Sequence, residues 1–228
     1  MNSIGDESII ERLPRQVGAK MANENERTEK DTNGAECIQF YTLESYLFNT
    51  VHRRFAEKGS LGAFDFFCIV IWKANRAKTK VAKRLLGDTT KTLDEVVIEL
   101  TKAIAAQKTP KDKMRFLMFG KIRFRLPMAS AILTVLYPDE FTVYDYRVCD
   151  TLGGYRNLTN LSNIDKLWEG YAAFKSAVIS NSPAGLSLRD RDRYLWGKSF
   201  RDQLTTDIAK VFQLVSEDEG LASADAVE

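Results

Sequence analysis

The segment Phe119–Val148, FGKIRFRLPMASAILTVLYPDEFTVYDYRV, contains the pattern that decides the fold. Its middle, residues 127–137, is predominantly apolar, and the Ala-Ser-Ala run at 129–131 allows a neighbouring backbone to approach closely, which is typical of a buried helix. Pro138 follows the helix and marks its end. The cations that precede it are Lys121, Arg123 and Arg125. Because helix N-termini carry unpaired amides and positive charge, the sequence predicts a core helix with a phosphate site at its start.

The rest of the chain has the periodicity of helices and shows no alternating strand pattern or hairpin of strands. Apolar residues recur at intervals of three and four, and the intervening glycines and prolines act as stops. The helices expected are 41–59, roughly 63–86, 92–107, 110–119, 127–137, 145–152, 163–180, 188–198 and 199–215. None of the five prolines interrupts these ranges beyond the first turn, so we predict an all-α domain.

The composition is that of a soluble globular protein. The chain has 228 residues, 44% of them hydrophobic, which is enough for one buried core. Its three cysteines, Cys37, Cys68 and Cys149, are far apart, so their spacing predicts neither disulfides nor a zinc or iron–sulfur site. No stretch approaches the roughly 18 apolar residues of a membrane span, and no signal-peptide pattern opens the chain. We expect a monomer without a membrane partner, cytoplasmic or, in a eukaryote, nuclear.

The net charge of +2 conceals an asymmetry along the chain. Residues 1–36 carry five Lys or Arg and eight Asp or Glu, a charge of −3, and residues 217–228 carry five acids and no Lys or Arg, a charge of −5. The segment 37–216 therefore carries +10. We expect a disordered arm over 1–36, a folded domain over 37–216 and an acidic disordered tail over 217–228. A basic body is typical of proteins that bind polyanions, although a surface tuned for solubility has the same charge.

A second basic group lies in WKANRAKTKVAKRLL, residues 72–86. Its cations recur at intervals of three and four, so they share one side of the helix expected over 63–86, opposite an apolar side. The members expected to contact DNA are Lys73, Arg76, Lys80 and Lys83. Trp72 and Asn75 lie beside them, and an indole and an amide next to cations suit base stacking and base contact. The alternative is an ordinary solvated face of an amphipathic helix.

Asp145 stands between Tyr144 and Tyr146, directly after an apolar anchor at 141–143. The chain re-enters the interior at that anchor, and a helix is expected to begin at or after the aspartate. The carboxylate is then an N-cap that accepts an amide hydrogen bond from Arg147 or the residue after it. A carboxylate held in this way has a defined rotamer and stays ionised, so capping and catalysis are compatible.

Together these features resemble the helix-hairpin-helix family of DNA glycosylases. In that family a hairpin precedes a small-residue helix, and a catalytic aspartate follows. Aligning Ala129–Leu133 with the family's second hairpin helix places Asp145 on that aspartate. The segment 64–86 is similar to the helix that lines the family's base pocket, and DRYLWGKSF (192–200) is similar to a late helix. The resemblance covers about residues 40–200 and implies two helical lobes with a DNA-binding cleft between them.

The hairpin departs from the family pattern. The family's Leu-Pro-Gly-Val-Gly loop offers amides to a phosphate, often through a monovalent cation, whereas its two glycines fall here on Arg123 and Arg125. Guanidinium groups can bind the phosphate instead. The sequence therefore does not decide whether this hairpin also binds a monovalent cation. Lyase-type members carry a nucleophilic lysine where this chain has Pro127, so the resemblance implies a glycosylase without lyase activity. The cysteine quartet of some members is absent, so neither an iron–sulfur cluster nor another metal is expected.

The resemblance implies base excision from double-stranded DNA. A base must leave the duplex before its glycosidic bond can be attacked. The residues expected to bind the DNA backbone are Lys121, Arg123, Arg125 and Arg147, together with Lys73, Arg76, Lys80 and Lys83. Those expected to hold the extruded base are Trp72, Asn75, Tyr144 and Tyr146. Asp145 is expected to stabilise the oxocarbenium-like sugar and to activate the incoming water.

Two other classes of function remain open. A non-catalytic DNA-binding relative of the same fold would bind DNA in a salt-dependent manner without depending on Asp145. An all-α scaffold unrelated to DNA would use Asp145 only as a helix cap. For a glycosylase, the open target classes are alkylated, deaminated, oxidised and mismatched bases and the modified bases of viral DNA. The role is then either DNA repair or defence against foreign DNA.

Overall fold

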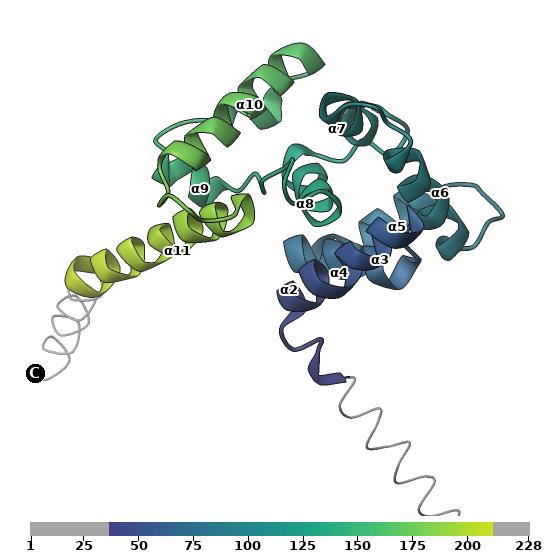
Figure 1. Ribbon diagram of the computed structural model, residues 1–228, viewed down its shortest axis with the longest axis horizontal. Helices are drawn as coiled ribbons and strands as arrows, with labels where there is room; N and C mark the ends of the chain where they lie inside the picture. Colours follow the sequence, from purple (N-terminus) through teal and green to yellow (C-terminus); the bar gives the residue numbers. More distant parts are fainter. Residues whose placement is uncertain (1–36, 212–228) are drawn as a thin grey trace, which may run out of the picture. The chain divides into compact units, whose positions relative to one another are not determined.

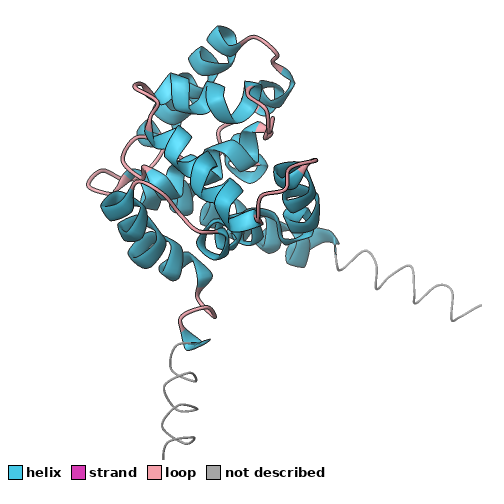
Figure 2. Ribbon diagram, turned by 90° about the vertical axis from the view of Figure 1, so that its right-hand side faces the viewer, coloured by secondary structure: helices cyan, strands magenta, loops and turns pink. Residues whose placement is uncertain are grey.

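The computed structural model describes residues 37–211, and every regular element in this range is a helix (Figures 1 and 2). The expected all-α class is therefore confirmed for the described residues. Contacts divide the chain into Met1–Leu43 and Glu44–Glu228, and the side chains discussed below belong to the second unit. The disordered arm expected over 1–36 and the acidic tail expected over 217–228 lie outside the described residues.

The first helical stretch lies close to the range 41–59 that the sequence predicts. It consists of α2 (Leu43–Tyr46), a π-helical turn (Leu47–Val51) and α3 (His52–Lys58). It ends at Gly59, whose φ of 66° is the left-handed conformation that closes many helices. Because glycine adopts this conformation without strain, the sequence alone locates the end of α3.

The long basic helix expected over 63–86 is in fact two helices. α4 (Ala63–Ala74) and α5 (Lys78–Leu86) are separated by a 3-10 turn at Asn75–Ala77. The break occurs at Ala74, whose φ of −160° and ψ of 85° leave the helical region. The prediction of one helix is wrong because the periodicity of the charges continues across the turn although the helical backbone does not. Cations before and after the break therefore do not share one face.

α6 (Leu93–Ala105) and α7 (Pro110–Phe119) match the ranges expected for them. A capping box starts α6, because the Thr92 hydroxyl accepts the Glu95 amide and the Glu95 carboxylate accepts the Thr92 amide. The Thr109 side chain caps α7 at the equivalent position. Local sequence thus determines where both helices begin.

α8 (Leu126–Leu136) is the central helix of the fold. Every residue from Met128 to Leu136 is buried, and the helix packs against α3, α4 and α7 (Figure 1). Ala129, Ser130 and Ala131 have no exposed surface, which allows the neighbouring elements to approach closely. Each large apolar side chain buried here contributes about 1.5–3 kcal/mol. The core helix predicted from 127–137 is therefore confirmed.

The connection from α7 to α8, residues 120–125, has one buried anchor and one strained residue. Phe124 is buried, and its amide donates to the Leu117 carbonyl at 2.9 Å. Arg123 is exposed and has a φ of 54°, a conformation that glycine adopts freely and arginine does not. Arg123 thus combines glycine-like backbone geometry with an arginine side chain.

The remaining helices follow the extended segment 141–145. They are α9 (Tyr146–Thr151), a 3-10 turn (Arg156–Asn160), α10 (Ile164–Ser180) and α11 (Leu188–Thr206). α11 packs against α9 and α10, and α10 also contacts α7. The ranges expected for α9 and α10, 145–152 and 163–180, are confirmed. The start of α9 is the position that matters for the site, because Asp145 precedes it.

α11 replaces the two separate helices expected over 188–198 and 199–215. The helix is continuous and passes into a π-helical turn at Asp207–Val211. An ion pair between Lys198 and Asp202 crosses the expected boundary, and pairs at this spacing stabilise a continuous helix. The prediction of two helices is wrong because no residue at that boundary leaves the helical conformation.

Replacing Arg123 with glycine is expected to stabilise the protein. The left-handed conformation costs an arginine on the order of 1 kcal/mol, and glycine removes most of that cost. We expect Arg123→Gly to raise the free energy of unfolding, measured in urea, by about 0.5–1 kcal/mol. Arg123→Ala is the matched control, because it removes the same charge but keeps the strained conformation. Equal stability of the glycine and alanine variants would contradict this account.

Candidate functional site

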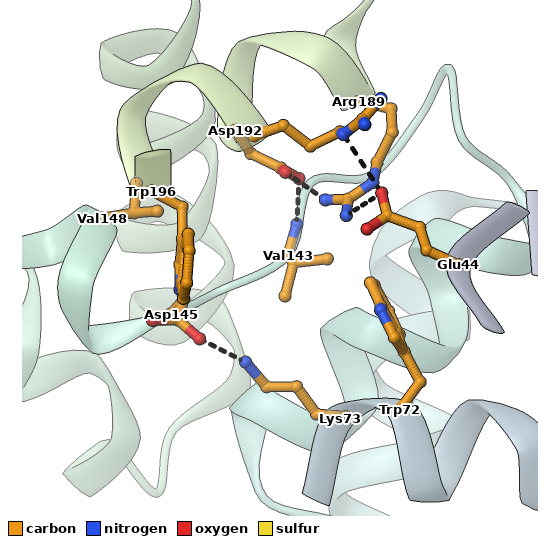
Figure 3. Close-up of a pocket in the computed structure, with 10 residues that line it drawn as sticks. Glu44, Trp72, Lys73, Val143, Asp145, Val148, Arg189, Asp192 and Trp196 are labelled. Atoms are coloured by element: carbon orange, nitrogen blue, oxygen red, sulfur yellow. Dashed lines mark hydrogen bonds and ion pairs between the residues drawn. The ribbon is translucent and has the colours of Figure 1, made fainter. Parts of the chain in front are cut away.

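A pocket of about 530 Å³ is bordered by α2, α4, α9, α11 and the extended segment 141–145 (Figure 3). The residues that line it are Glu44, Trp72, Lys73, Val143, Asp145, Val148, Arg189, Asp192, Arg193 and Trp196. Three of them are acids, three are cations and two are tryptophans. This volume is in the range of small-molecule sites, and aromatic walls with a few convergent polar groups are typical of such sites.

Asp145 is fixed at the start of α9. Its backbone is extended, and its Oδ1 accepts the Arg147 amide at 3.0 Å, so the predicted N-cap is confirmed. Its Oδ2 lies 2.7 Å from the Lys73 ammonium. The side chain of Asp145 is 27% exposed, and it borders the pocket. The carboxylate therefore combines a defined rotamer with access to a ligand.

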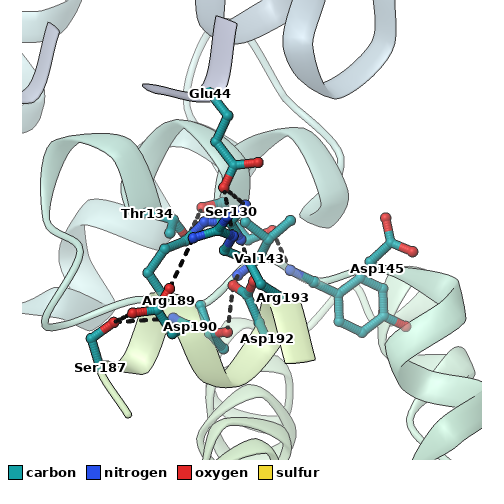
Figure 4. A network of polar contacts seen from close by, with 12 residues as sticks. Glu44, Ser130, Thr134, Val143, Asp145, Ser187, Arg189, Asp190, Asp192 and Arg193 are labelled. Carbon is teal, nitrogen blue, oxygen red and sulfur yellow. Dashed lines mark hydrogen bonds and ion pairs between the residues drawn. The ribbon is translucent and has the colours of Figure 1, made fainter. Parts of the chain in front are cut away.

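Within residues 37–211 the extended segment that carries Asp145 has no partner strand, and side chains from other elements satisfy its backbone (Figure 4). The Thr142 amide donates to the Tyr171 hydroxyl at 3.0 Å, and that hydroxyl donates to the Thr142 carbonyl at 2.7 Å. The Tyr144 amide donates to Ser130 Oγ at 2.9 Å. Because buried backbone groups must be paired, these bonds determine the path of the segment.

Asp192 on α11 is the buried carboxylate that completes this support. Only 3% of the residue is exposed, and its Oδ2 accepts hydrogen bonds from the Val143 amide and the Thr142 hydroxyl, each at 3.1 Å. Its Oδ1 accepts from the Arg189 guanidinium. Burial raises the pKa of Asp192 to about 6, against the opposing effects of Arg189 and the two hydrogen bonds. Asp192 thus links α11 to the backbone beside Asp145.

Arg189 connects the carboxylates at the upper wall of the pocket in Figure 3. It donates to Glu44 at 2.6 Å as well as to Asp192, and its side chain is 15% exposed. The guanidinium also lies over two rings, with Cζ 5.0 Å from the centroid of Phe48 and 5.1 Å from that of Trp72. These contacts join α2, α4 and α11 around the pocket.

The second tryptophan of the pocket, Trp196, comes from α11. Its ring stacks on Phe200, with centroids 5.8 Å apart and an interplanar angle of 5°. Arg147 lies over Trp196, with Cζ 5.6 Å from the ring centroid, and also donates to Gln203 at 2.8 Å. Trp72 and Trp196 therefore give the pocket two aromatic surfaces, each already in contact with a guanidinium group.

Of the residues predicted to hold a base, only Trp72 lines the pocket. Tyr144 is completely buried, and its hydroxyl donates to the Tyr155 carbonyl at 2.6 Å. Tyr146 is 48% exposed and does not line the pocket, and Asn75 is exposed in the 3-10 turn. Alternate side chains of an extended segment point to opposite sides, so Tyr144 points away from the pocket. Tyr144 is therefore not placed to contact a ligand in this pocket.

The sequence predicts that Lys73 is one of the DNA-binding cations, but in the structure its ammonium is paired with the Asp145 carboxylate. Its side chain is 14% exposed and lines the pocket, whereas Arg76, Lys80 and Lys83 beyond the break at Ala74 are exposed. The basic stretch is thus divided between an internal ammonium and a set of surface cations. The reason is the change of backbone direction at Ala74.

The cations of the connection from α7 to α8 and those of α5 lie next to each other. Arg84 on α5 donates to the carbonyls of Ile122 and Arg123, at 3.3 and 3.2 Å. Lys121, Arg123 and Arg125 are all exposed, as expected for groups that bind phosphate. The structure therefore brings together the two basic groups that the sequence suggested separately.

Five polar or aromatic residues of the pocket are not among the site residues that the sequence predicts. They are Glu44, Arg189, Asp192, Arg193 and Trp196. Four of them lie in RDRDRYLW, residues 189–196, for which the sequence predicts a helix but no site residue. The available signal was the spacing of Asp192 and Leu195, which places an acid on the same side of α11 as a buried leucine.

Comparisons with protein-family models, curated proteins and solved structures give no match to this chain. Within the described residues, no helix combines the length and apolar character that crossing a membrane requires. The same residues contain no group of three or more His, Cys, Asp or Glu side chains arranged to hold a metal ion.

The burial of Asp192 predicts a pH-dependent contribution to stability. In the folded protein its carboxyl group keeps a proton up to pH about 6, whereas in the unfolded chain the proton is lost near pH 4. As pH rises from about 4 to 7, wild-type stability is therefore expected to fall relative to Asp192→Asn by on the order of 1–3 kcal/mol. Asparagine keeps an acceptor for the Val143 amide and does not ionise. Denaturant titrations of both proteins across this range provide the measurement, and a difference independent of pH would contradict the account.

Proposed function

We propose that this protein is a monofunctional DNA glycosylase, which hydrolyses the N-glycosidic bond of an extruded damaged, mismatched or modified base. The observation that carries the proposal is the placement of Asp145, with one oxygen fixed by the Arg147 amide and the other beside a pocket bordered by two tryptophans. A carboxylate held in this way can act on a bound nucleoside without first losing rotamer freedom. The resemblance to the helix-hairpin-helix glycosylases supports the same assignment.

In the proposed reaction the extruded base enters the pocket beside Trp72 and Trp196, with the deoxyribose next to Asp145. As the glycosidic bond breaks, positive charge develops on the sugar, and the carboxylate stabilises it. The same carboxylate then orients a water molecule and accepts its proton as the oxygen bonds to C1′. One acid can perform both steps because they occur in succession.

The proposed DNA-binding surface combines the hairpin with α5. The bonds from Arg84 to the hairpin carbonyls bring the exposed cations of the two elements together, and the N-terminal end of α8 adds a positive helix end. Two lobes, a helix-hairpin-helix motif and a DNA cleft between the lobes all belong to this proposal. Its partner is double-stranded DNA bound by a monomer, in the cytoplasm or nucleus.

The second candidate is a non-catalytic DNA-binding relative of the same fold. The ion pair of Lys73 with Asp145 favours it, because a cation 2.7 Å from the carboxylate opposes stabilisation of a positive sugar. The arginines at the two hairpin glycine positions favour it as well. In this case the pocket would hold an extruded base without cleaving its glycosidic bond. Either candidate fits DNA repair or defence against foreign DNA.

Asp145→Asn is expected to abolish base release and to preserve the fold. Asparagine is as good an N-cap as aspartate, but it brings no charge to the sugar and accepts no proton from water. We expect the rate to fall by at least about 100-fold and DNA binding to be kept or improved. The measurement uses duplexes with alkylated, deaminated, oxidised or mismatched bases and modified cytosines, followed by heating in alkali to cleave abasic strands.

Asp139→Asn is the matched control for this experiment. It makes the same change at an exposed aspartate in the turn after α8, outside the pocket, and is expected to leave the rate at the wild-type value. If the wild-type protein and Asp145→Asn bind DNA equally and neither releases any base, the glycosylase is rejected in favour of the non-catalytic candidate.

Lys80 and Lys83, both exposed on α5, are expected to contact DNA phosphates. Each phosphate contact contributes about −0.9 to the slope of log K against log salt concentration for duplex DNA. Changing both lysines to glutamine is therefore expected to reduce the magnitude of that slope by about 1–2, as measured by fluorescence anisotropy. Lys166→Gln, at an exposed lysine of α10, is the control. An unchanged slope in the double variant would place α5 outside the DNA-binding surface.

A further inference from the structure

Lys73 brings a fixed positive charge to the reactive carboxylate of the site. It belongs to the last turn of α4, and its ammonium lies 2.7 Å from Asp145 Oδ2. Its side chain is 14% exposed, whereas Arg76 and Lys80 are exposed. Lys73 is therefore an internal group of the pocket rather than part of the surface that attracts DNA.

The tryptophans of the pocket are already in contact with cations. Arg189 lies 5.1 Å from the centroid of Trp72, and Arg147 lies 5.6 Å from that of Trp196. An aromatic ring attracts a cation through the negative potential of its faces. A guanidinium on one face weakens this attraction for a second cation, so the two rings are poorly suited to select a positively charged base.

The acids of the pocket are matched by cations as well. Glu44 pairs with Arg189 at 2.6 Å and with Arg193 at 3.2 Å, and Asp192 accepts from the same Arg189. The third acid is the one paired with Lys73. The lining of the pocket therefore offers no unmatched carboxylate to a cationic ligand.

We propose that Lys73 is a catalytic residue that receives the negative charge of the departing base, and that the substrate is a base which is neutral in DNA and leaves as an anion. This inference rests on the proposed glycosylase function and narrows its substrate class. Oxidised, deaminated and mismatched bases and cytosines with neutral substituents belong to this class. A purine alkylated at N3 or N7 does not, because it is cationic in DNA and leaves as a neutral molecule.

The Lys73–Asp145 pair offers one negative and one positive group, and the transition state for such a substrate develops one positive and one negative charge. When the bond from C1′ to the base nitrogen breaks, its electron pair moves to the base, so the sugar becomes positive and the base negative. The carboxylate then stabilises the sugar while the ammonium stabilises the base. By itself the ammonium would disfavour a positive sugar. Because the base becomes negative in the same step, the ammonium stabilises the base.

The protons also balance over one turnover. Lys73 donates a proton to the anionic base, and Asp145 accepts a proton from the water whose oxygen bonds to C1′. The products are the neutral base and an abasic sugar, which together contain the substrate and one water molecule. Because the two side chains lie 2.7 Å apart, the proton on Asp145 then passes to Lys73 and restores the ion pair.

The test compares the release of neutral bases and of 7-methylguanine by the full-length protein and by Lys73→Gln. For neutral bases we expect the substitution to lower the rate by about 100-fold or more, and the deficit to be larger for uracil than for 5-fluorouracil, the better leaving group. For 7-methylguanine we expect an unchanged or higher rate, because no anion forms and a repulsive charge is removed. Lys73→Arg keeps the charge and is expected to retain more of the rate for neutral bases than Lys73→Gln does.

Lys102→Gln, at an exposed lysine of α6, is the matched control and is expected to behave as the wild type on every duplex. Faster release of 7-methylguanine than of every neutral base by the wild type would overturn the inference and leave the glycosylase function intact. An equal loss for both kinds of base in Lys73→Gln would also overturn it, because that pattern indicates a structural role. Release of no base by the wild type would reject the proposed function, and the inference with it.

Discussion

The site depends on the hydrogen bond that the buried Asp192 carboxylate accepts from the backbone beside Asp145. In the described part of the chain no strand lies beside this extended segment to satisfy its amides, and a buried unpaired amide costs about 1–3 kcal/mol. Asp192, Ser130 and Tyr171, from three different helices, satisfy the segment 141–145 instead. Because these bonds fix the segment, they also fix the start of α9 and the direction of the carboxylate that caps it.

The same carboxylate organises the far side of the pocket. Asp192 accepts from Arg189, which in turn donates to Glu44 and lies over the Trp72 ring. A buried carboxylate and a guanidinium with little exposure stabilise each other where neither would be stable alone. One network thus supports both the catalytic candidate on one wall and the aromatic surface on the other. A ligand between Trp72 and Asp145 would meet a preorganised site.

Local sequence patterns predicted most of the fold and the residue at the centre of the site. The capping box at 92–95 and the small residues of α8 act within a few positions, and so does the cap at Asp145, so each could be read directly. The partners of the site lie too far apart in sequence for this, because Val143 and Asp192 are separated by 49 residues and Lys73 and Asp145 by 72. Tyr144 is a different case, because in an extended segment adjacent side chains point to opposite sides, so Asp145 can border the pocket while Tyr144 is buried.

The break at Ala74 explains how one basic stretch can serve two purposes. A straight helix over 63–86 would place Lys73 on the same face as Lys80, so a lysine directed at Asp145 would bring the surface cations toward the pocket with it. The 3-10 turn at 75–77 removes this constraint. One ammonium can then stay inside, beside the carboxylate, while the cations of α5 remain exposed next to the connection from α7 to α8. The division of the basic stretch between an internal lysine and a set of surface cations therefore originates in the backbone, at a position where the side chains give no sign of it.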